Sequence, residues 1–312
     1  MSAPVIIFVY NRPIHTKMTF ESLRDNYDAK DSDVIIFSDY ARDQTAIERV
    51  LEVRDYIKYV KNQNWFKSVS IFESEENMGL AKSIIDGVSK VFEHSSSVIV
   101  LEDDLITSKD FLRFMNSALS HYSEDHRIWS ISGYNIPIKV RKNYKHDVYL
   151  SLRGSSWGWG TWRDRWKMID WNVSDYNEFK KSLVARNGFN LGGRDLSIML
   201  DLQMEGKIDS WAIRWCYTQF RNGMFTVYPT KSKVENKGFD GSGTHGKHAT
   251  LARSSLASEG VFAFPNTLEP DQVMIRRFRN YYLSISSYIV IVIKLKLKKI
   301  GYEFKRFFTN TI

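Results

Sequence analysis

Three consecutive acidic residues, Glu102, Asp103 and Asp104, directly follow the apolar residues 98–101. Carboxylates crowded at the end of a buried strand repel one another and are costly to desolvate, so they need a cation or hydroxyl donors nearby. Carboxylate oxygens suit hard divalent ions, Mn²⁺ or Mg²⁺, which also take phosphate oxygens as ligands. A helix N-cap would explain Asp104 alone, but not three acids. We therefore expect a divalent-metal site at this strand end.

The elements that must position these acids alternate between two hydrophobic periods. Short apolar runs, typical of buried strands, lie at residues 5–10, 34–37, 69–72 and 98–101, and helical patterns lie at 14–27, 42–62, 79–93 and 108–122. This alternation predicts an α/β fold with a mostly parallel sheet flanked by helices. Such sheets bind ligands at the carboxyl ends of their strands, where Arg12, Asp39 and the three acids all lie.

The second half of the chain is less regular. Strands are expected at 129–133 and 224–228, helices at 174–186 and 194–205, and a mobile glycine-rich loop at 236–248. The segment SSWGWGTW alternates glycine with indoles, whose faces stack on sugar C–H groups. We expect Trp157 and Trp159 to line a substrate pocket, and Trp162 and Trp166, at helical spacing, to be buried. A tryptophan-rich corner of the core is the alternative.

The net charge of +8 is concentrated at one end of this 312-residue chain. Residues 276–312 hold nine basic residues and one acid, so they account for the whole excess. A basic stripe across the folded body is not expected, which argues against a nucleic-acid partner. The apolar residues 288–293 are followed by alternating lysines, a pattern that favours an anionic membrane surface over a packed terminal helix.

The acidic strand end also carries a family resemblance. The run VIVLEDDL, followed by KDF, resembles the Glu-Asp-Asp (DxD-like) motif of the GT-A fold glycosyltransferases, particularly the family 2 and N-acetylglucosaminyltransferase I types. The YNRP turn, the SSWGWGTW segment, a later D-x-W and the glycine-rich loop resemble the same group, over about residues 1–250. The resemblance implies a Rossmann-like GT-A domain that uses a nucleoside-diphosphate sugar.

This resemblance implies roles for the residues at the strand ends. Asp104 would be the direct metal ligand, and Glu102 and Asp103 would bind hydroxyls of the donor sugar and ribose. Arg12 would contact the nucleotide diphosphate or base, in keeping with bidentate binding of phosphate by guanidinium. Asp39 would accept a hydrogen bond from a uracil-type N–H. The alternatives are a surface salt bridge for Arg12 and a turn residue for Asp39.

Two further residues complete the expected donor site. Gly79 lets the backbone approach a ligand at the start of a helical pattern, and Lys82 is placed to reach a phosphate, although a simple helix cap would also explain this segment. In several GT-A enzymes a late histidine completes the metal site, and imidazole is a suitable ligand. His245, in the glycine-rich loop, is the candidate for that role, and His248 is the second choice.

Inverting transfer, which the resemblance favours, needs a carboxylate base that deprotonates the acceptor hydroxyl. The acids considered for this role are Asp195, Asp201, Glu205 and Asp209. Asp209 precedes Ser-Trp and resembles the D-x-W segment of the family, so it is the first candidate, and Asp195, after Gly-Gly-Arg, is the second. A solvated helix acid is the alternative for each.

These patterns predict a GT-A domain at 1–265, with a nucleotide-sugar half at 1–125, an acceptor half at 126–265 and a basic amphipathic tail at 266–312. The expected reaction is metal-dependent transfer from a UDP-sugar to a glycan or lipid-linked oligosaccharide in surface polysaccharide synthesis. With no signal peptide expected, the predicted location is cytoplasmic, peripheral at the inner face of a bacterial cell membrane. The alternatives are a sugar-1-phosphate nucleotidyltransferase and a non-catalytic glycan-binding protein.

Overall fold

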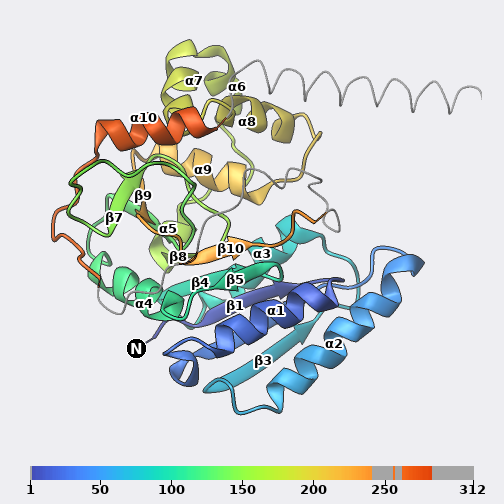
Figure 1. The fold of residues 1–312 in the computed structure, drawn as a ribbon. Coiled ribbons are helices and arrows are strands. Elements are labelled where there is room, and N and C mark those ends of the chain that lie inside the picture. The colour runs from blue at the N-terminus through green and yellow to red at the C-terminus, as the bar shows by residue number, and fades with distance from the viewer. Residues whose placement is uncertain (1, 241–255, 257–261, 283–312) are drawn as a thin grey trace, which may run out of the picture.

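The structure is a computed structural model that describes residues 2–240, 256 and 262–282 (Figure 1). Eight strands form one sheet in the order β3-β2-β1-β4-β8-β6-β9-β7, and β10 pairs with β5 in a second sheet. The strands are β1 (Val5–Val9), β2 (Asp33–Ser38), β3 (Ser68–Glu73), β4 (Ser97–Glu102), β5 (Leu105–Thr107), β6 (Ile128–Ser132), β7 (Val148–Ser151), β8 (Trp159–Trp162), β9 (Phe225–Pro229) and β10 (Val234–Asn236). The predicted α/β fold with a mostly parallel sheet is confirmed.

The first four strands all run in parallel. β1 lies between β2 and β4, with Val9 opposite Ser38 and Phe8 opposite Glu102. All five side chains of β1 are buried, as a strand covered on both faces requires. This pairing places the carboxyl ends of β1, β2 and β4 at one edge of the sheet, where the predicted site residues follow them.

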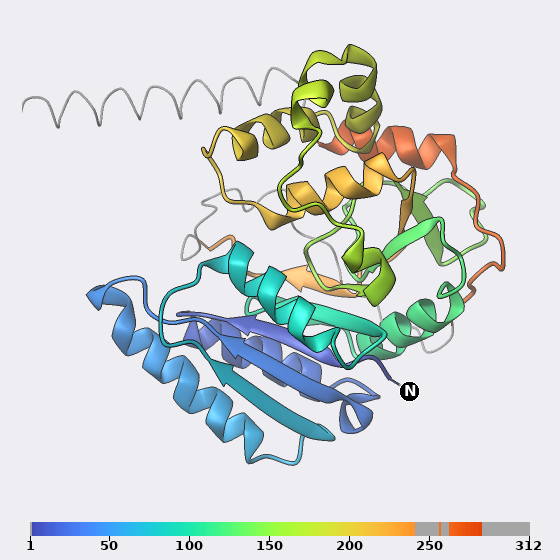
Figure 2. The same cartoon turned by 180° about the vertical axis from the view of Figure 1, so that it is seen from behind.

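Helices cover both faces of these strands (Figures 1 and 2). α1 (Pro13–Arg24), α2 (Ile47–Lys61) and α4 (Phe111–His121) share a core with one face, and α3 (Leu80–Val91) packs on the other. Two short 3₁₀ helices described in the first half are η1 (Ala29–Asp31) and η2 (Gln44–Ala46), and η3 (Asn190–Gly192) lies in the second half. Each of the four predicted helices of this half is present.

The second half joins the same sheet through antiparallel strands, because β8 pairs with both β4 and β6. Its helices are α5 (Arg163–Lys167), α6 (Tyr176–Lys181), α7 (Leu183–Phe189), α8 (Leu196–Met204), α9 (Trp211–Arg221) and α10 (Gln272–Tyr281). The predicted helix at 174–186 is two helices, because Ser182 is extended and its hydroxyl accepts a hydrogen bond from the Ala185 N–H at 3.1 Å.

α10 lies within the segment predicted to be a tail. Its Met274 and Phe278 are buried, and the helix packs against η3 and β7. Residues 272–281 therefore belong to the folded body, whereas residues 283–312 lie outside the described residues. In the described part of the chain, no helix is long and apolar enough to cross a membrane.

Candidate active site

The turn after β1 brings a guanidinium onto the acids that end β4. Pro13 starts α1 immediately after β1, so Arg12 becomes the residue before the first helical turn. Its Nη2 donates to Asp103 Oδ1 and lies 2.9 Å from Asp104 Oδ2. The Tyr10 N–H also donates to Asp103, at 3.3 Å. The side chains of Arg12, Asp103 and Asp104 are all largely buried, so these contacts are shielded from water.

The site carries more negative charge than Arg12 neutralises. Desolvation, reinforced by the charges of Asp104 and Asp103, raises the pKa of Glu102 to about 8. Desolvation also raises the pKa of Asp103, although the adjacent Arg12 opposes that shift. Both shifts have the electrostatic cause that the sequence predicted, which is the crowding of carboxylates at a buried strand end. The arrangement favours any additional cation.

A turn after β10 lies directly on Asp104. β10 pairs with β5, and the Lys237 N–H donates to the carbonyl oxygen of Asp104 at 2.8 Å. A Cβ atom on Gly238 would lie 2.1 Å from Asp104 Oδ2 and 2.9 Å from Arg12 Nη1, so a larger residue here would displace these side chains. From its sequence context Gly238 was expected in a mobile loop at 236–248, and its contact with Asp104 was not predicted. The short glycine spacing of NKGFDG was the available signal.

The class of protein follows from a comparison over this same region. Residues 1–174, which contain β1, β4 and the acidic cluster, match the GNT-I family. This match covers more than half of the 312 residues. The chain belongs to the GNT-I family. The expected resemblance is therefore confirmed at the level of the family.

Similarity to solved structures is more distant. The chain resembles the crystal structure of S. aureus TarS 1-349 with 14% identity and a TM-score of 0.41, covering 77% of this chain and 61% of that one. The structure of S. aureus TarS 1-349 in complex with UDP gives 16% identity and a TM-score of 0.42, with 75% and 60% coverage. The GNT-I family chain thus spans about three-fifths of the length of these proteins. No curated protein matches it.

The donor set at the acidic cluster fits a divalent ion of the Mg²⁺ type. Among the described residues, no three His, Cys, Asp or Glu side chains form a ready metal-binding group. Mg²⁺ does not need one, because it is usually held by one or two carboxylates, with phosphate oxygens and water completing the octahedron. Asp104, next to Glu102 with its raised pKa, supplies such a carboxylate. His245 and His248 lie outside the described residues.

Asp39 holds the loop between β3 and α3. Its carboxylate accepts hydrogen bonds from the Met78 N–H at 2.8 Å and the Gly79 N–H at 3.0 Å. Gly79 has a φ of +74°, a conformation that favours glycine. Asp39 therefore stabilises the conformation of this loop at the carboxyl edge of the sheet. Lys82 is exposed on the first turn of α3, where it pairs with Asp86.

The two candidate bases have very different surroundings. Asp195 is 7% exposed, and its two carboxylate oxygens accept hydrogen bonds from Arg153 at 2.7 and 3.1 Å. The side chain of Asp209 is 72% exposed and lies 3.5 Å from Arg214 Nη2. Asp195 is thus occupied by a buried ion pair, whereas Asp209 is open to water and to a ligand.

Of the two tryptophans expected to line a substrate pocket, only Trp157 lies near the acidic cluster, whereas Trp159 is part of the core. Trp157 is partly buried, with ring contacts to Tyr134 at 4.5 Å and Phe239 at 5.5 Å between centroids. Phe239 adjoins Gly238, so Trp157 lies close to the acidic cluster.

Trp159 is 1% exposed and does not present its indole face to a ligand. Its ring packs among other indoles, those of Trp166, Trp211 and Trp215. Trp162 and Trp166 are buried, as predicted.

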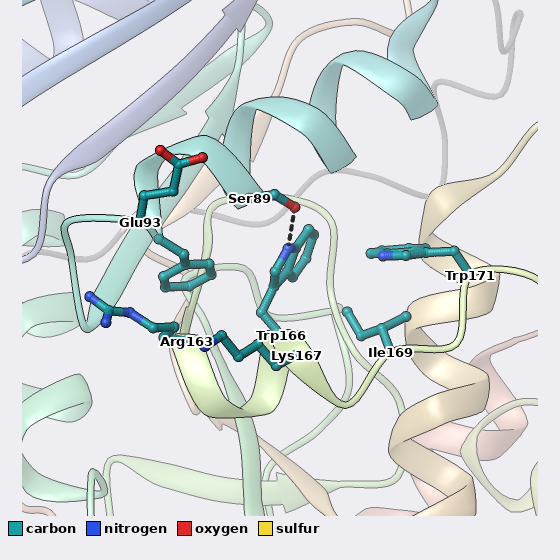
Figure 3. Close-up of a pocket in the computed structure, with 8 residues that line it drawn as sticks. Ser89, Glu93, Arg163, Trp166, Lys167, Ile169 and Trp171 are labelled. Carbon is teal, nitrogen blue, oxygen red and sulfur yellow. Dashed lines mark hydrogen bonds between the residues drawn. The ribbon is translucent and has the colours of Figure 1, made fainter.

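A cavity of about 390 Å³ lies at the other end of α3 from Gly79 (Figure 3). It is lined by Ser89, Phe92, Glu93, Arg163, Trp166, Lys167, Ile169 and Trp171. In Figure 3 the Trp166 indole N–H points to the Ser89 hydroxyl, a hydrogen bond of 2.9 Å. Because α3 runs from the carboxyl edge of the sheet to its amino edge, this cavity is separate from the acidic cluster.

Proposed function

We propose that the chain transfers a sugar from a UDP-sugar to a hydroxyl of a glycan or lipid-linked oligosaccharide, with inversion and with a divalent metal. The observation that carries this proposal is the contact of Arg12 with Asp103 and Asp104 at the carboxyl edge of the sheet. Open α/β sheets bind their ligands at this edge. Surface polysaccharide synthesis is the setting that this substrate class suggests.

The acidic cluster has separable tasks in this reaction. Asp104 would hold Mn²⁺ or Mg²⁺, and the bound ion would supply charge stabilisation for the departing diphosphate. Glu102 and Asp103 accept hydrogen bonds from donor hydroxyls, and Arg12 contacts the diphosphate through its fork of N–H donors. Asp39 keeps the 77–79 loop at the rim of the nucleotide site, with Lys82 nearby on α3 as a further phosphate contact.

Asp209 is the better candidate for the base. A base must exchange a proton with the acceptor, and a carboxylate that already accepts two hydrogen bonds from Arg153, as Asp195 does, is poorly suited to that. Among the described residues, the charged partner of Asp209 is Arg214, at the long distance of 3.5 Å. Trp157 supplies an aromatic surface for the acceptor sugar, on the side of the acidic cluster where Phe239 lies. His245 remains the proposed additional metal ligand.

The catalytic domain comprises both halves of the chain, and the C-terminal segment attaches it to an anionic membrane at the cytoplasmic face. One sheet built from both halves supports the single domain. The sequence of residues 283–312, with its apolar run and its lysines, supports the membrane attachment.

A panel of nucleotide sugars tests the proposal. Donor hydrolysis and transfer are measured with Mn²⁺ present and after chelation, and UDP binding is followed by calorimetry. We expect UDP-sugars to be used only with the metal, and Asp104→Ala to abolish turnover while the protein remains folded by circular dichroism. If no nucleotide sugar binds, or if Asp104→Ala leaves turnover unchanged, the proposed chemistry is wrong.

A further inference from the structure

The start of α7 presents two aliphatic side chains to solvent. Leu183 is 76% exposed and Val184 is 85% exposed, the two highest values among the large hydrophobic residues described as exposed. The Ser182 hydroxyl caps this helix by accepting a hydrogen bond from the Ala185 N–H, so the pair is held on a rigid helix rather than on a loop. Adjacent exposed aliphatics on one rigid helix form a small apolar surface that is suited to a partner that removes it from water.

Basic side chains flank this tip. Lys180 and Lys181 end α6 and are exposed directly before Leu183 and Val184. The next base, Arg186, turns inward to Asp201, with hydrogen bonds of 2.8 and 2.7 Å, and does not add to the tip. Two exposed lysines next to two exposed aliphatics are complementary to a lipid bilayer with anionic headgroups, because the aliphatics enter the acyl boundary while the lysines remain among the headgroups.

The last described residues of the chain lie on the same side of the molecule. α7 continues into η3, and α10 packs against η3. Tyr282, the last described residue, lies under Arg153 at 3.8 Å and against Gly193, the residue after η3. Arg276 is exposed on α10. Figures 1 and 2 both show α6, α7 and α10 at one end of the molecule, with β3 at the other.

We propose that Lys180, Lys181, Leu183 and Val184, here called the α7 tip, form a second membrane contact that docks on an anionic bilayer. The proposal rests on the proposed membrane attachment of residues 283–312, which follow Tyr282 in the sequence. The tail alone would tether the catalytic domain without orienting it. Two contacts on one end of the molecule fix which face of the domain meets the membrane.

Single-site labelling tests whether the tip enters a bilayer. Cys216 is the chain's only cysteine and is buried, so Val184→Cys in the full chain takes up an environment-sensitive fluorophore selectively. We expect its emission to rise and shift to the blue with vesicles of phosphatidylglycerol and phosphatidylethanolamine, but not with phosphatidylcholine alone. A label at Leu51→Cys, a 51% exposed site on α2, is the matched control and stays unchanged. An unchanged label at residue 184 overturns the inference.

Vesicle sedimentation separates this inference from the proposed role of the tail. In the full chain, Leu183→Gln with Val184→Gln should lower partitioning about thirtyfold, which corresponds to about 2 kcal/mol for the two aliphatics together, and UDP binding should not change. Lysine-to-glutamine changes at 294, 296, 298 and 299 test the tail. If only the tail variant loses binding, the tail proposal stands and the tip inference falls. If the tip variant keeps its vesicle binding but sediments as a smaller species than the unmodified chain in sedimentation velocity, the α7 tip is a contact between two copies of the chain. That result would also overturn the inference.

Discussion

Arg12 Nη2 lies 2.9 Å from Asp104 Oδ2. The guanidinium therefore contacts the same carboxylate that we propose as the metal ligand. Arg12 already neutralises part of the charge that a divalent ion would neutralise. On the proposed metal role of Asp104, a divalent ion and Arg12 would compete for this carboxylate until a diphosphate gave Arg12 an alternative partner. Nucleotide and metal should consequently bind with positive coupling.

Replacing Arg12 tests this competition. We expect Arg12→Gln to raise the affinity for Mn²⁺ in the absence of nucleotide about tenfold, since a charge-assisted hydrogen bond is worth about 1.5 kcal/mol. The same variant should bind UDP more weakly. Electron paramagnetic resonance of free Mn²⁺ measures the first effect. Arg24→Gln, at the C-terminal end of α1 and paired with Asp25, is the control. An unaltered Mn²⁺ affinity for Arg12→Gln would contradict the competition.

Gly238 provides a test of the turn that covers Asp104. The methyl group of Gly238→Ala would collide with Asp104 Oδ2 and press on Arg12 Nη1. We expect at least a tenfold loss of UDP affinity, because overpacking of this kind costs roughly 1–3 kcal/mol and here falls on the binding groups. Calorimetry measures the affinity, and thermal unfolding serves as the check on the fold. Normal UDP binding by a folded variant would show that the turn moves away from Asp104 freely.

The two candidate bases give opposite predictions. Asp209→Asn should abolish transfer with little effect on the free energy of unfolding, because its side chain is exposed. Asp195→Asn should destabilise the protein by about 3 kcal/mol, since it leaves Arg153 buried without a charged partner. Urea unfolding and a transfer assay are needed for both variants. If Asp209→Asn transfers sugar normally, the base lies elsewhere.

Asp271 links the stability of α10 to pH. Burial raises its pKa, but hydrogen bonds from the Met274 N–H and Arg141 outweigh this, and the pKa falls below its ordinary value of 3.8. The native state thus favours the charged carboxylate, so the stabilisation is complete above that ordinary pKa and is lost as the pH falls through the lower native pKa. We expect Asp271→Ala to cost about 1 kcal/mol near neutral pH. In urea unfolding this cost should vanish in strong acid. An equal cost near neutral pH and in strong acid would show that ionisation of Asp271 does not cause the pH dependence of stability.

The sequence predicted the first half of the fold well because its strands are buried on both faces. Runs such as residues 5–10 and 98–101 therefore consist of continuous apolar residues, and the polar residues after them mark the binding edge. In the second half, the expected strands at 129–133 and 224–228 and the expected helix at 194–205 are present as β6, β9 and α8. β7 and β8 were not predicted, because they are four-residue strands whose pairing is antiparallel and long-range. No local pattern announces such strands.

The same limit applies to the site. Adjacency in sequence was enough to predict the acidic cluster, and parallel pairing brought Arg12 to it. The contact between Gly238 and Asp104 depends on the pairing of β10 with β5, which joins segments more than 120 residues apart. The burial of Trp159 likewise depends on α9, which supplies Trp211 and Trp215. Neither relationship has a local signature.

The pairing of β4 with β8 should prevent the two halves of this chain from folding as separate fragments. The strand that ends in the acids is hydrogen-bonded on one side to β1 and on the other to the tryptophan-rich strand, with Val100 opposite Trp159. A chain cut near residue 125 would expose two complementary sheet edges, one on β4 and one on β8. The fragments should be insoluble when made separately and should regain UDP binding only when produced together, as a split protein does.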